Sequence, residues 1–406
     1  MIELASNYTC TGCGCCENTC PHRAVSLLPD KEGFLQPNIN TDVCVECGLC
    51  VAKCPVLNTP DFGITGNPKA YAVISNDDRE KSSSGGAFSV FARYVIQKGG
   101  IVYGATMNDK LQVSHVKVSS IDELDKLRGS KYVQSKIGTT YYDAKQDLKL
   151  GKIVLFSGTP CQIDGLYKYI GKKYINQLIT LDLVCHGVPN QQFFDSYINK
   201  LKQSTHLKEH NKDVTGYRFR KLDSWSIVPT VKFAESKWQV LEQEDNAFMS
   251  SFFHLMTFRE CCYKCQYSQK NRVGTYTIAD YWGIGKDGLK FNKNVSAGVS
   301  LVLYNGGPTK DILVEMHDLA YIEERPLDEC LKYNHNLNAP SVRPNTRNTA
   351  VADMLDDSIS LLEYSQKYNL LENKWEHMAK KTIKNIIYGL GIYNMYKTIS
   401  YKIRGK

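Results

Sequence analysis

Residues 10–21 read CTGCGCCENTCP, and residues 44–55 read CVECGLCVAKCP. Both stretches follow the pattern C-x2-C-x2-C-x3-C-P, and the second repeats the first at a constant offset of 34 residues, from Cys10 to Cys44. Gly14 and Gly48 also occupy equivalent places between the second and third Cys. Two copies in register indicate a duplicated unit, in which each copy places three thiols on one tight loop and a fourth just beyond it.

The spacing is that of bacterial two-cluster ferredoxins, in which the fourth Cys of each run ligates the other cluster. The residue before a proline favours an extended backbone, which carries that fourth Cys away from its own loop. A zinc site, the alternative, is typical of separated C-x2-C pairs. The pattern therefore predicts two [4Fe-4S] clusters that move single electrons. Their ligands are Cys10, Cys13, Cys16 and Cys54 for one cluster, and Cys44, Cys47, Cys50 and Cys20 for the other.

Length and composition fit a globular protein of two or three domains, with 406 residues of which 42% are hydrophobic and 23% are charged. Fifteen Cys in a chain this long do not suggest a secreted disulfide framework. Thiolate ligands require a reducing compartment, so we expect a cytoplasmic protein. We expect neither a signal peptide nor a membrane-spanning helix, because no stretch has the required apolar run.

The formal net charge of +8 is concentrated at one end of the chain. Residues 371–406 hold eight Lys or Arg and two Glu, a local charge of +6, which leaves +2 for the other 370 residues. The body therefore shows no pattern typical of a nucleic-acid groove. Within the tail, residues 380–404 mix Lys with apolar residues, which predicts contact with a membrane surface or a partner protein. The alternative is an ordinary amphipathic helix packed on its own domain.

The order of the patterns predicts an α+β fold. A turn signal between residues 24–28 and 34–38 predicts a hairpin within the Cys-rich part. Residues 59–68, which contain two Pro and two Gly, are expected to form a linker. The predicted parts are a dicluster ferredoxin-like domain (1–58), a mixed-sheet α/β domain (69–340) and a helical basic tail (341–406).

Strands and helices alternate in the second part. Apolar residues at helical spacing from Phe88 onward predict a helix that ends at Gly99. Ser120 with Glu123 fits the pattern of a capping box and predicts a further helix. Alternating patterns at residues 214–221 and 227–234 predict antiparallel strands, so the sheet is expected to be mixed. Further strands are predicted at residues 70–75, 153–157, 178–184, 276–279 and 299–304.

Four more Cys follow the ends of predicted elements. Cys161 and Cys185 each come after a strand, and Cys262 and Cys265 form a C-x2-C after a helix. Because ligands bind at the strand ends of α/β sheets, we expect the first two thiols to meet at one rim. Four thiolates can hold a third [4Fe-4S] cluster; the alternative is that these Cys are small buried apolar residues. The leftover Cys15, Cys261 and Cys330 are expected to be structural, although Cys261 could replace its neighbour Cys262.

A serine- and glycine-rich turn precedes the helix that starts near Phe88. Ser84, Gly85 and Gly86 allow close backbone approach, and free amides at a helix N-terminus bind phosphate. This turn predicts a dinucleotide such as FAD, and a plain Ser N-cap is the alternative.

Other candidates lie on predicted loops and strand ends. Lys131, Tyr132 and Gln134 could line a flavin ring or form a surface turn. Asp280 offers a hydrogen-bond acceptor at a strand end. His186, beside Cys185, could transfer a proton, although a single His is more often a hydrogen-bonded neighbour.

Six strings occur together: SSSGGAFS at 82–89, SKYVQS at 130–135, GTPCQIDGL at 158–166, CHGVP at 185–189, C-x2-C at 262–265 and IADYWG at 278–283. They resemble the family of coenzyme F420 hydrogenase/dehydrogenase beta subunits, in its bacterial form with an N-terminal dicluster ferredoxin domain. The resemblance covers residues 1 to about 305. It implies a large domain that binds FAD and one more [4Fe-4S] cluster, with Cys161, Cys185, Cys262 and Cys265 as ligands.

The resemblance also implies the flavin contacts. The family's Phe-Arg-x-Lys reads Phe219-Arg220-Lys221-Leu222 here, so Arg220 is carried over and the role of the family's Lys stays open. The implied contacts are Ser84, Gly85, Gly86, Lys131, Tyr132, Gln134, Gly158, Thr159 and Gln162.

The implied function is that of an oxidoreductase in which clusters relay single electrons to FAD, and the flavin exchanges a hydride with an organic substrate. His186 and Lys131 are the candidate proton donors. A ferredoxin or similar redox protein is the expected partner, and chains of this arrangement are associated with polysaccharide-building pathways. One alternative is an electron-transfer subunit of a larger complex, linked to coenzyme F420 or ferredoxin, without its own substrate site. The other is a cluster-bearing module without a flavin.

Overall fold

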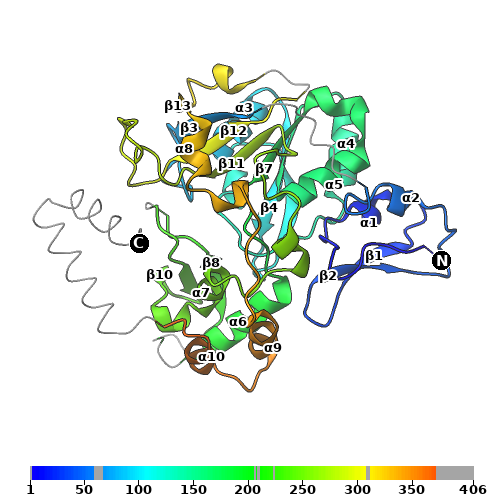
Figure 1. The fold of residues 1–406 in the computed structure, drawn as a ribbon, viewed down its shortest axis with the longest axis vertical. Helices are drawn as coiled ribbons and strands as arrows, with labels where there is room; N and C mark the ends of the chain where they lie inside the picture. The colour runs from blue at the N-terminus through cyan, green and yellow to red at the C-terminus, as the bar shows by residue number, and fades with distance from the viewer. Residues whose placement is uncertain are drawn as a thin grey trace, which may run out of the picture.

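The computed structural model describes residues 2–58, 67–204, 207, 211–222, 225–307 and 311–371. A small N-terminal unit lies beside a larger body, which contains an eight-stranded sheet and, apart from it, a group of helices with a small sheet (Figure 1). Most of the predicted linker and the whole of segment 380–404 lie outside the described residues. In the part of the chain that is described, no helix is long and apolar enough to cross a membrane.

The N-terminal unit consists of two short helices and one hairpin. α1 (Cys15–Thr19) and α2 (Leu49–Ala52) start after Gly14 and Gly48, whose φ angles are 76° and 73°. Glycine adopts such angles without strain, which explains why it recurs at this place in both copies. β1 (Val25–Pro29) and β2 (Leu35–Ile39) pair antiparallel, so the predicted hairpin is confirmed.

The main sheet has the strand order β13-β3-β12-β11-β7-β6-β4-β5. Its central strands β11, β7, β6 and β4 run parallel, whereas the outer pairings are antiparallel. The prediction of a mixed sheet is therefore confirmed. The strands are β3 (Lys69–Ser75), β4 (Ile101–Met107), β5 (Val113–Val118), β6 (Val154–Gly158), β7 (Leu178–Leu183), β11 (Tyr276–Asp280), β12 (Ser300–Tyr304) and β13 (Ala320–Arg325).

Five predicted strands correspond to β3, β6, β7, β11 and β12, whereas β4, β5 and β13 were not predicted. The predicted capping box is not formed. Glu123 Oε2 accepts from Ser119 N and Ser120 Oγ, whereas a capping box needs Ser120 Oγ to accept from Glu123 N and the Glu123 carboxylate to accept from Ser120 N. The prediction of a full helix at this place is also wrong. Only one 3-10 turn, Leu124–Lys126, fits before Gly129 reverses the chain with a φ of 79°.

Helices cover both faces of the main sheet. α3 (Ala87–Gln97) packs on one face with Val102 and Leu155, and it ends just before Gly99, as predicted. α4 (Thr140–Lys149) and α5 (Pro160–Ile170) pack on the other face with Tyr103 and Phe156. Neighbouring residues of β4 and β6 thus enter different cores, because successive side chains of a strand point to opposite faces.

A second core lies beside the main sheet. The strands predicted at 214–221 and 227–234 are antiparallel, but they belong to a separate sheet and not to the main one. This small sheet packs with one helix that precedes it in the sequence and with three that follow it. The first part of the predicted tail is helical and belongs to this core. The elements are α6 (Gln191–Lys202), β8 (Val214–Arg218), β9 (Thr230–Phe233), β10 (Gln239–Val240), α7 (Ala247–Phe253), α9 (Arg347–Leu355) and α10 (Leu361–Lys367); α8 (Leu327–Leu331) lies near β3.

Candidate functional site

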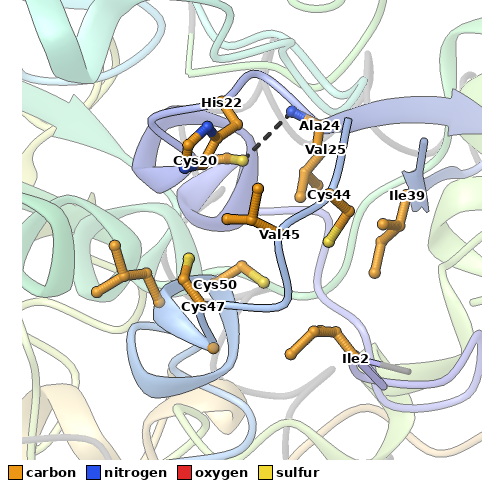
Figure 2. Close-up of a pocket in the computed structure, with 12 residues that line it drawn as sticks. Ile2, Cys20, His22, Ala24, Val25, Ile39, Cys44, Val45, Cys47 and Cys50 are labelled. Carbon is orange, nitrogen blue, oxygen red and sulfur yellow. Dashed lines mark hydrogen bonds between the residues drawn. The ribbon is translucent and has the colours of Figure 1, made fainter. Parts of the chain in front are cut away.

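Each thiol set predicted from the Cys spacing surrounds a small cavity of its own. In Figure 2, Cys20 approaches Cys44, Cys47 and Cys50 from a different turn of the chain, and Ala24 N donates a hydrogen bond of 3.3 Å to Cys20 Sγ. The structure thereby brings the fourth Cys of each run to the loop of the other. We call Cys20, Cys44, Cys47 and Cys50 the outer quartet, and Cys10, Cys13, Cys16 and Cys54 the inner quartet.

A third quartet joins three segments at the carboxyl end of the main sheet. Cys161 lies in the first turn of α5 after β6, Cys185 follows β7, and Cys262 and Cys265 lie in and just after a 3-10 helix, Glu260–Lys264. Burial, and then the thiols of Cys265 and Cys262, raises the pKa of Cys161 to about 12. Burial, and then the other three thiols, raises the pKa of Cys185 well above its ordinary value. The four thiols thus lie close enough to influence one another electrostatically.

The leftover thiols have other surroundings. Cys15 and Cys330 are fully buried and donate to the carbonyl oxygens of Lys53 (3.3 Å) and Leu327 (3.0 Å). Cys261 lies beside Cys262, and its hydrogen bond lowers the pKa of the Cys262 thiol. Cys15 and Cys330 are packed as structural residues, whereas Cys261 stays next to the third quartet.

A cavity of about 460 Å³ lies at the carboxyl ends of the parallel strands. Ligands of α/β sheets bind at this edge, and their pockets commonly measure about 300–1,000 Å³. Cys185 of the third quartet forms part of the cavity wall. The predicted site residues that line it are Ser84, Gly86, Lys131, Tyr132, Gln134, Gly158, Thr159, Gln162, His186, Arg220 and Asp280.

Gly85, which was predicted to contact the cofactor, does not line this cavity. A Cβ atom there would lie 2.2 Å from Val73 O and 2.4 Å from Ser300 N, so the glycine is required for packing between β3 and β12. Gly86 has a φ of 88° and begins α3 at the cavity. The two glycines therefore have different roles, and Gly86 is the one placed to face a ligand.

Two predicted ligand-binding amides are already engaged within the protein. Gln162 Oε1 accepts a hydrogen bond of 3.0 Å from Thr159 N, in the capping box of α5. Gln134 Nε2 donates to Thr11 O at 2.8 Å, and its Oε1 accepts from Arg259 Nη2 at 3.0 Å. Both side chains form part of the cavity wall, and the hydrogen bonds of Gln134 connect distant parts of the chain.

Arg220 is the buried cation of the cavity wall. Its Nη1 lies 2.7 Å from Asp280 Oδ2, and the other oxygen of Asp280 accepts from Trp225 Nε1 at 2.6 Å. Asp280 therefore holds Arg220 in place, and both of its oxygens are engaged. Nη2 of Arg220 is buried without a hydrogen bond, which leaves one charged donor for an anionic ligand.

Lys131 is a cavity residue whose pKa lies far from its ordinary value. Burial lowers the pKa of its amine to about 7. Its Nζ donates to the carbonyl oxygens of Leu127 at 2.8 Å and Arg128 at 2.9 Å. Both protonation states are therefore populated near neutral pH.

Two histidines also face the cavity. Burial lowers the pKa of His115 to about 4, and its ring nitrogens lie 2.8 Å from Ser135 Oγ and Ser157 O. His186 is open to the cavity, but protein atoms surround it and this desolvation lowers its pKa. His115 was not predicted, because a single His in an unpredicted strand forms no pattern.

The inner quartet is held against the body. α1 lies beside α5 (Figure 1), and a Cβ atom at Gly165 of α5 would lie only 3.1 Å from Cys13 Sγ. Tyr141 donates to Cys13 O at 2.8 Å. Since Cys161 lies on the same helix as Gly165, α5 contacts both the inner quartet and the third quartet.

Comparisons with known families agree with this arrangement. Residues 9–58 match the 4Fe-4S dicluster domain, and residues 151–330 match the family described as the C terminus of the coenzyme F420 hydrogenase/dehydrogenase beta subunit. Residues 151–330 of this chain belong to the C-terminal domain family of the coenzyme F420 hydrogenase/dehydrogenase beta subunit. The dicluster domain in front of that beta-subunit domain confirms the binding of [4Fe-4S] clusters, and the chain is an iron–sulfur redox protein.

Relatives of the beta-subunit domain are distant. One subunit of the F(420)H(2) dehydrogenase of Methanosarcina mazei is 23% identical over 237 residues, which cover 55% of this chain and 66% of that protein. The coenzyme F420-dependent sulfite reductase of Methanocaldococcus jannaschii is 28% identical over 174 residues, which cover 41% of this chain and 26% of that protein. The matches therefore span less than two thirds of each of these relatives.

A solved structure is also similar in part. A chain of the F420-reducing [NiFe] hydrogenase complex from Methanosarcina barkeri aligns with a TM-score of 0.41 and 14% sequence identity. The alignment covers 76% of this chain and 92% of that chain.

Proposed function

We propose that this protein is an iron–sulfur flavoprotein oxidoreductase. Single electrons would pass among three [4Fe-4S] clusters and FAD, and an organic substrate would be reduced or oxidised by two electrons in the large cavity. The observation that carries the proposal is Cys185, a member of the third quartet that lines the same cavity as Gly86 and Arg220. A one-electron carrier and a cofactor pocket would thus share one wall.

The three quartets fit iron–sulfur clusters. Among the described residues, no group of three or more His, Cys, Asp or Glu is placed to hold a single metal ion. A [4Fe-4S] cube instead holds its four thiolates on separate iron atoms. Burial raises the pKa of the Cys161 and Cys185 thiols, so their thiolate forms require a cationic partner such as iron.

The large cavity fits a dinucleotide. Gly86 places the N-terminus of α3 at the cavity, where the helix dipole favours a phosphate. The unpaired Nη2 of Arg220 supplies a second donor for an anionic group. When bound, FAD would convert between the single electrons of clusters and the electron pairs of organic reactions.

Lys131 is the residue best suited to move a proton in the cavity. General acids and bases work best when their pKa lies near the working pH, and the amine of Lys131 has a pKa of about 7. If Nζ donates a proton to the substrate, turnover falls as the pH rises above about 7. His186 is the second candidate. The single variants Lys131→Met and His186→Gln distinguish the two, because only substitution of the actual proton donor removes the pH dependence of turnover.

The outer quartet is where a partner protein would exchange electrons. Cys47 is exposed, and so are the neighbouring apolar residues Val45 and Leu49. Asp42 and Glu46 add negative charge to the same loop. A small apolar patch with acidic neighbours suits a transient contact with a redox carrier that presents an apolar centre and a basic rim.

Iron content tests the number of clusters. Anaerobically purified protein should contain about twelve irons per chain, three clusters of four. Cys161→Ser should remove close to four of them and leave the dicluster domain loaded. Cys330→Ser is the matched control, because the Cys330 thiol donates to Leu327 O and lies in none of the three quartets. This variant should retain all of the roughly twelve irons. About eight irons in the reconstituted wild type would refute the third cluster.

Flavin retention tests the cofactor. Gly86→Asp would test packing as well as charge, because a Cβ atom there would lie 2.8 Å from Ser75 Cβ. Ser84→Asp tests the charge alone when it is compared with Ser84→Asn, a variant of equal size. Ser84 lines the cavity beside the proposed phosphate position. We expect FAD to be lost from the Asp variant and retained by the Asn variant. Equal retention in both would place the phosphate elsewhere.

An electron-transfer subunit without its own substrate site is the second candidate. It is favoured by the name of one relative, which is a subunit of a dehydrogenase. Turnover of organic substrates by the isolated chain with artificial electron donors would support the enzyme. Turnover that requires a second protein would support the subunit. The link to polysaccharide-building pathways stays a prediction of the sequence resemblance.

A further inference from the structure

Arg259 is a buried cation without a carboxylate partner. Its side chain is only 1% exposed, and none of the ion pairs within the described residues includes it. Other deeply buried arginines have acidic partners, such as Asp182 for Arg272 and Glu329 for Arg325. Burying a charge is costly unless an opposite charge compensates it. A negative group must therefore lie near Arg259 in the loaded protein.

The guanidinium is held at the inner quartet. Nη1 of Arg259 donates to Cys10 O at 3.3 Å, and Nη2 donates to Leu35 O at 2.9 Å and to Gln134 Oε1 at 3.0 Å. Its carbon centre lies 5.1 Å from the centre of the Phe34 ring. These neutral contacts fix the orientation of the guanidinium, but they supply no net negative charge.

The backbone of the same residue belongs to the third quartet. Arg259 O accepts a hydrogen bond of 3.0 Å from Cys262 N, and Arg259 N donates at 3.1 Å to Val188 O, three residues after Cys185. Arg259 therefore connects the third quartet with the inner one. Gly12 makes the connection possible, because a Cβ atom there would lie 2.6 Å from Nη2 of Arg259.

We propose that Arg259 is the shared counter-ion of the inner and third clusters and that it raises the reduction potentials of both. Reduction adds negative charge to a thiolate-bound cluster, and a nearby buried cation stabilises the reduced form. The inner half of this inference uses only the dicluster domain, and the other half rests on the proposed third cluster.

Redox titrations of the loaded full-length protein, followed by electron paramagnetic resonance, test the proposal. Arg259→Met removes the charge and keeps much of the volume, so the potentials of the inner and third clusters should fall while that of the outer cluster stays unchanged. Arg259→Lys keeps the charge with fewer hydrogen bonds, so it should retain most of the wild-type potentials. A purely structural role would make the Lys and Met variants behave alike, and that result would overturn the proposal. Arg325→Met, whose arginine pairs with Glu329, is the control for loss of a buried arginine.

A second variant keeps the test decisive if the Met variant loses iron. Gln134→Glu places a carboxylate against the guanidinium with almost no change in volume, so it should lower the same two potentials. Unchanged potentials in this variant would also overturn the proposal. An iron content of about eight would refute the third cluster as part of the proposed function, and the inner cluster would still report on Arg259.

Discussion

The two copies of the Cys motif share their spacing but have opposite surroundings. In the first copy, Gly12, Cys13 and Cys15 are buried. At the equivalent places of the second copy, 34 residues later, Glu46, Cys47 and Leu49 are exposed. The contrast is largest between Cys15, at 0% exposure, and Leu49, at 43%. The spacing therefore places thiols on a loop, but it does not decide what the loop faces.

The difference comes from the body of the protein. A Cβ atom at Gly14 would lie 3.2 Å from Ile137, whereas no atom lies within 4 Å of one at Gly48. The first copy is thus closed by contacts with α5 and its neighbours, and the second copy stays open to solvent. The two ends of the duplicated unit therefore differ, with an inner end packed against the body and an outer end exposed to solvent.

The largest expected difference between the copies concerns two glycines. Gly12→Ala forces a φ of 64° on a residue with a side chain, which costs about 1–2 kcal/mol. It also presses on the buried Arg259, and overpacking adds about 1–3 kcal/mol. Gly48→Ala, with a φ of 73° and open space around it, should cost only the backbone term. Urea unfolding of both anaerobic variants measures the difference, and equal losses would contradict the closed inner copy.

A reciprocal exchange at equivalent positions should have a somewhat smaller effect. Cys15→Leu adds volume at a fully buried site and should cost about 1–3 kcal/mol. Leu49→Cys removes volume at an exposed site and should change the stability by less than about 0.5 kcal/mol. Thermal unfolding under anaerobic conditions compares the two, and a larger loss for Leu49→Cys would reverse the assignment of inner and outer copies.

The smallest expected effect is on electron exchange at the outer end. Val45→Ser combined with Leu49→Ser should slow reduction by a partner protein by about tenfold, equivalent to 1.4 kcal/mol, because the apolar contact is weakened. Reduction by a small dye should not change, because the thiols of the outer quartet are untouched. Leu28→Ser, at another exposed apolar residue of the dicluster domain, is the matched control. Stopped-flow rates that are equal in all three proteins would place the partner elsewhere.

Much of the fold could be predicted from local patterns. The hairpin, α3 and five strands of the main sheet follow from apolar periodicity and from glycine at element ends. β4 was missed because Gly104 interrupts its apolar run, and β13 was missed because it is an edge strand with acidic residues, Glu323 and Glu324. Edge strands carry weaker apolar patterns, since one side of them faces solvent.

The site was predictable where chemistry needs a particular residue type. The grouping of the Cys side chains and the position of Gly86 at the cavity could be predicted, because thiolate ligands and helix N-termini have few substitutes. Arg259 and His115 were not predicted, and neither were the hydrogen bonds of Gln134 to Thr11 and Arg259. Their roles depend on partners far along the chain, such as Cys10, which is 249 residues from Arg259.

The sequence by itself determined the two Cys loops, the crossing of their fourth Cys and the helix that follows the turn at Ser84–Gly86. These features depend on backbone geometry within a dozen residues, which spacing, proline and glycine restrict directly. Only the tertiary structure decided which loop is buried, how Cys161, Cys185, Cys262 and Cys265 come together, and which side chains line the cavity. Those outcomes depend on the packing of segments that are far apart in the chain, and packing is settled by the burial of the whole sheet and its helices rather than by any local pattern.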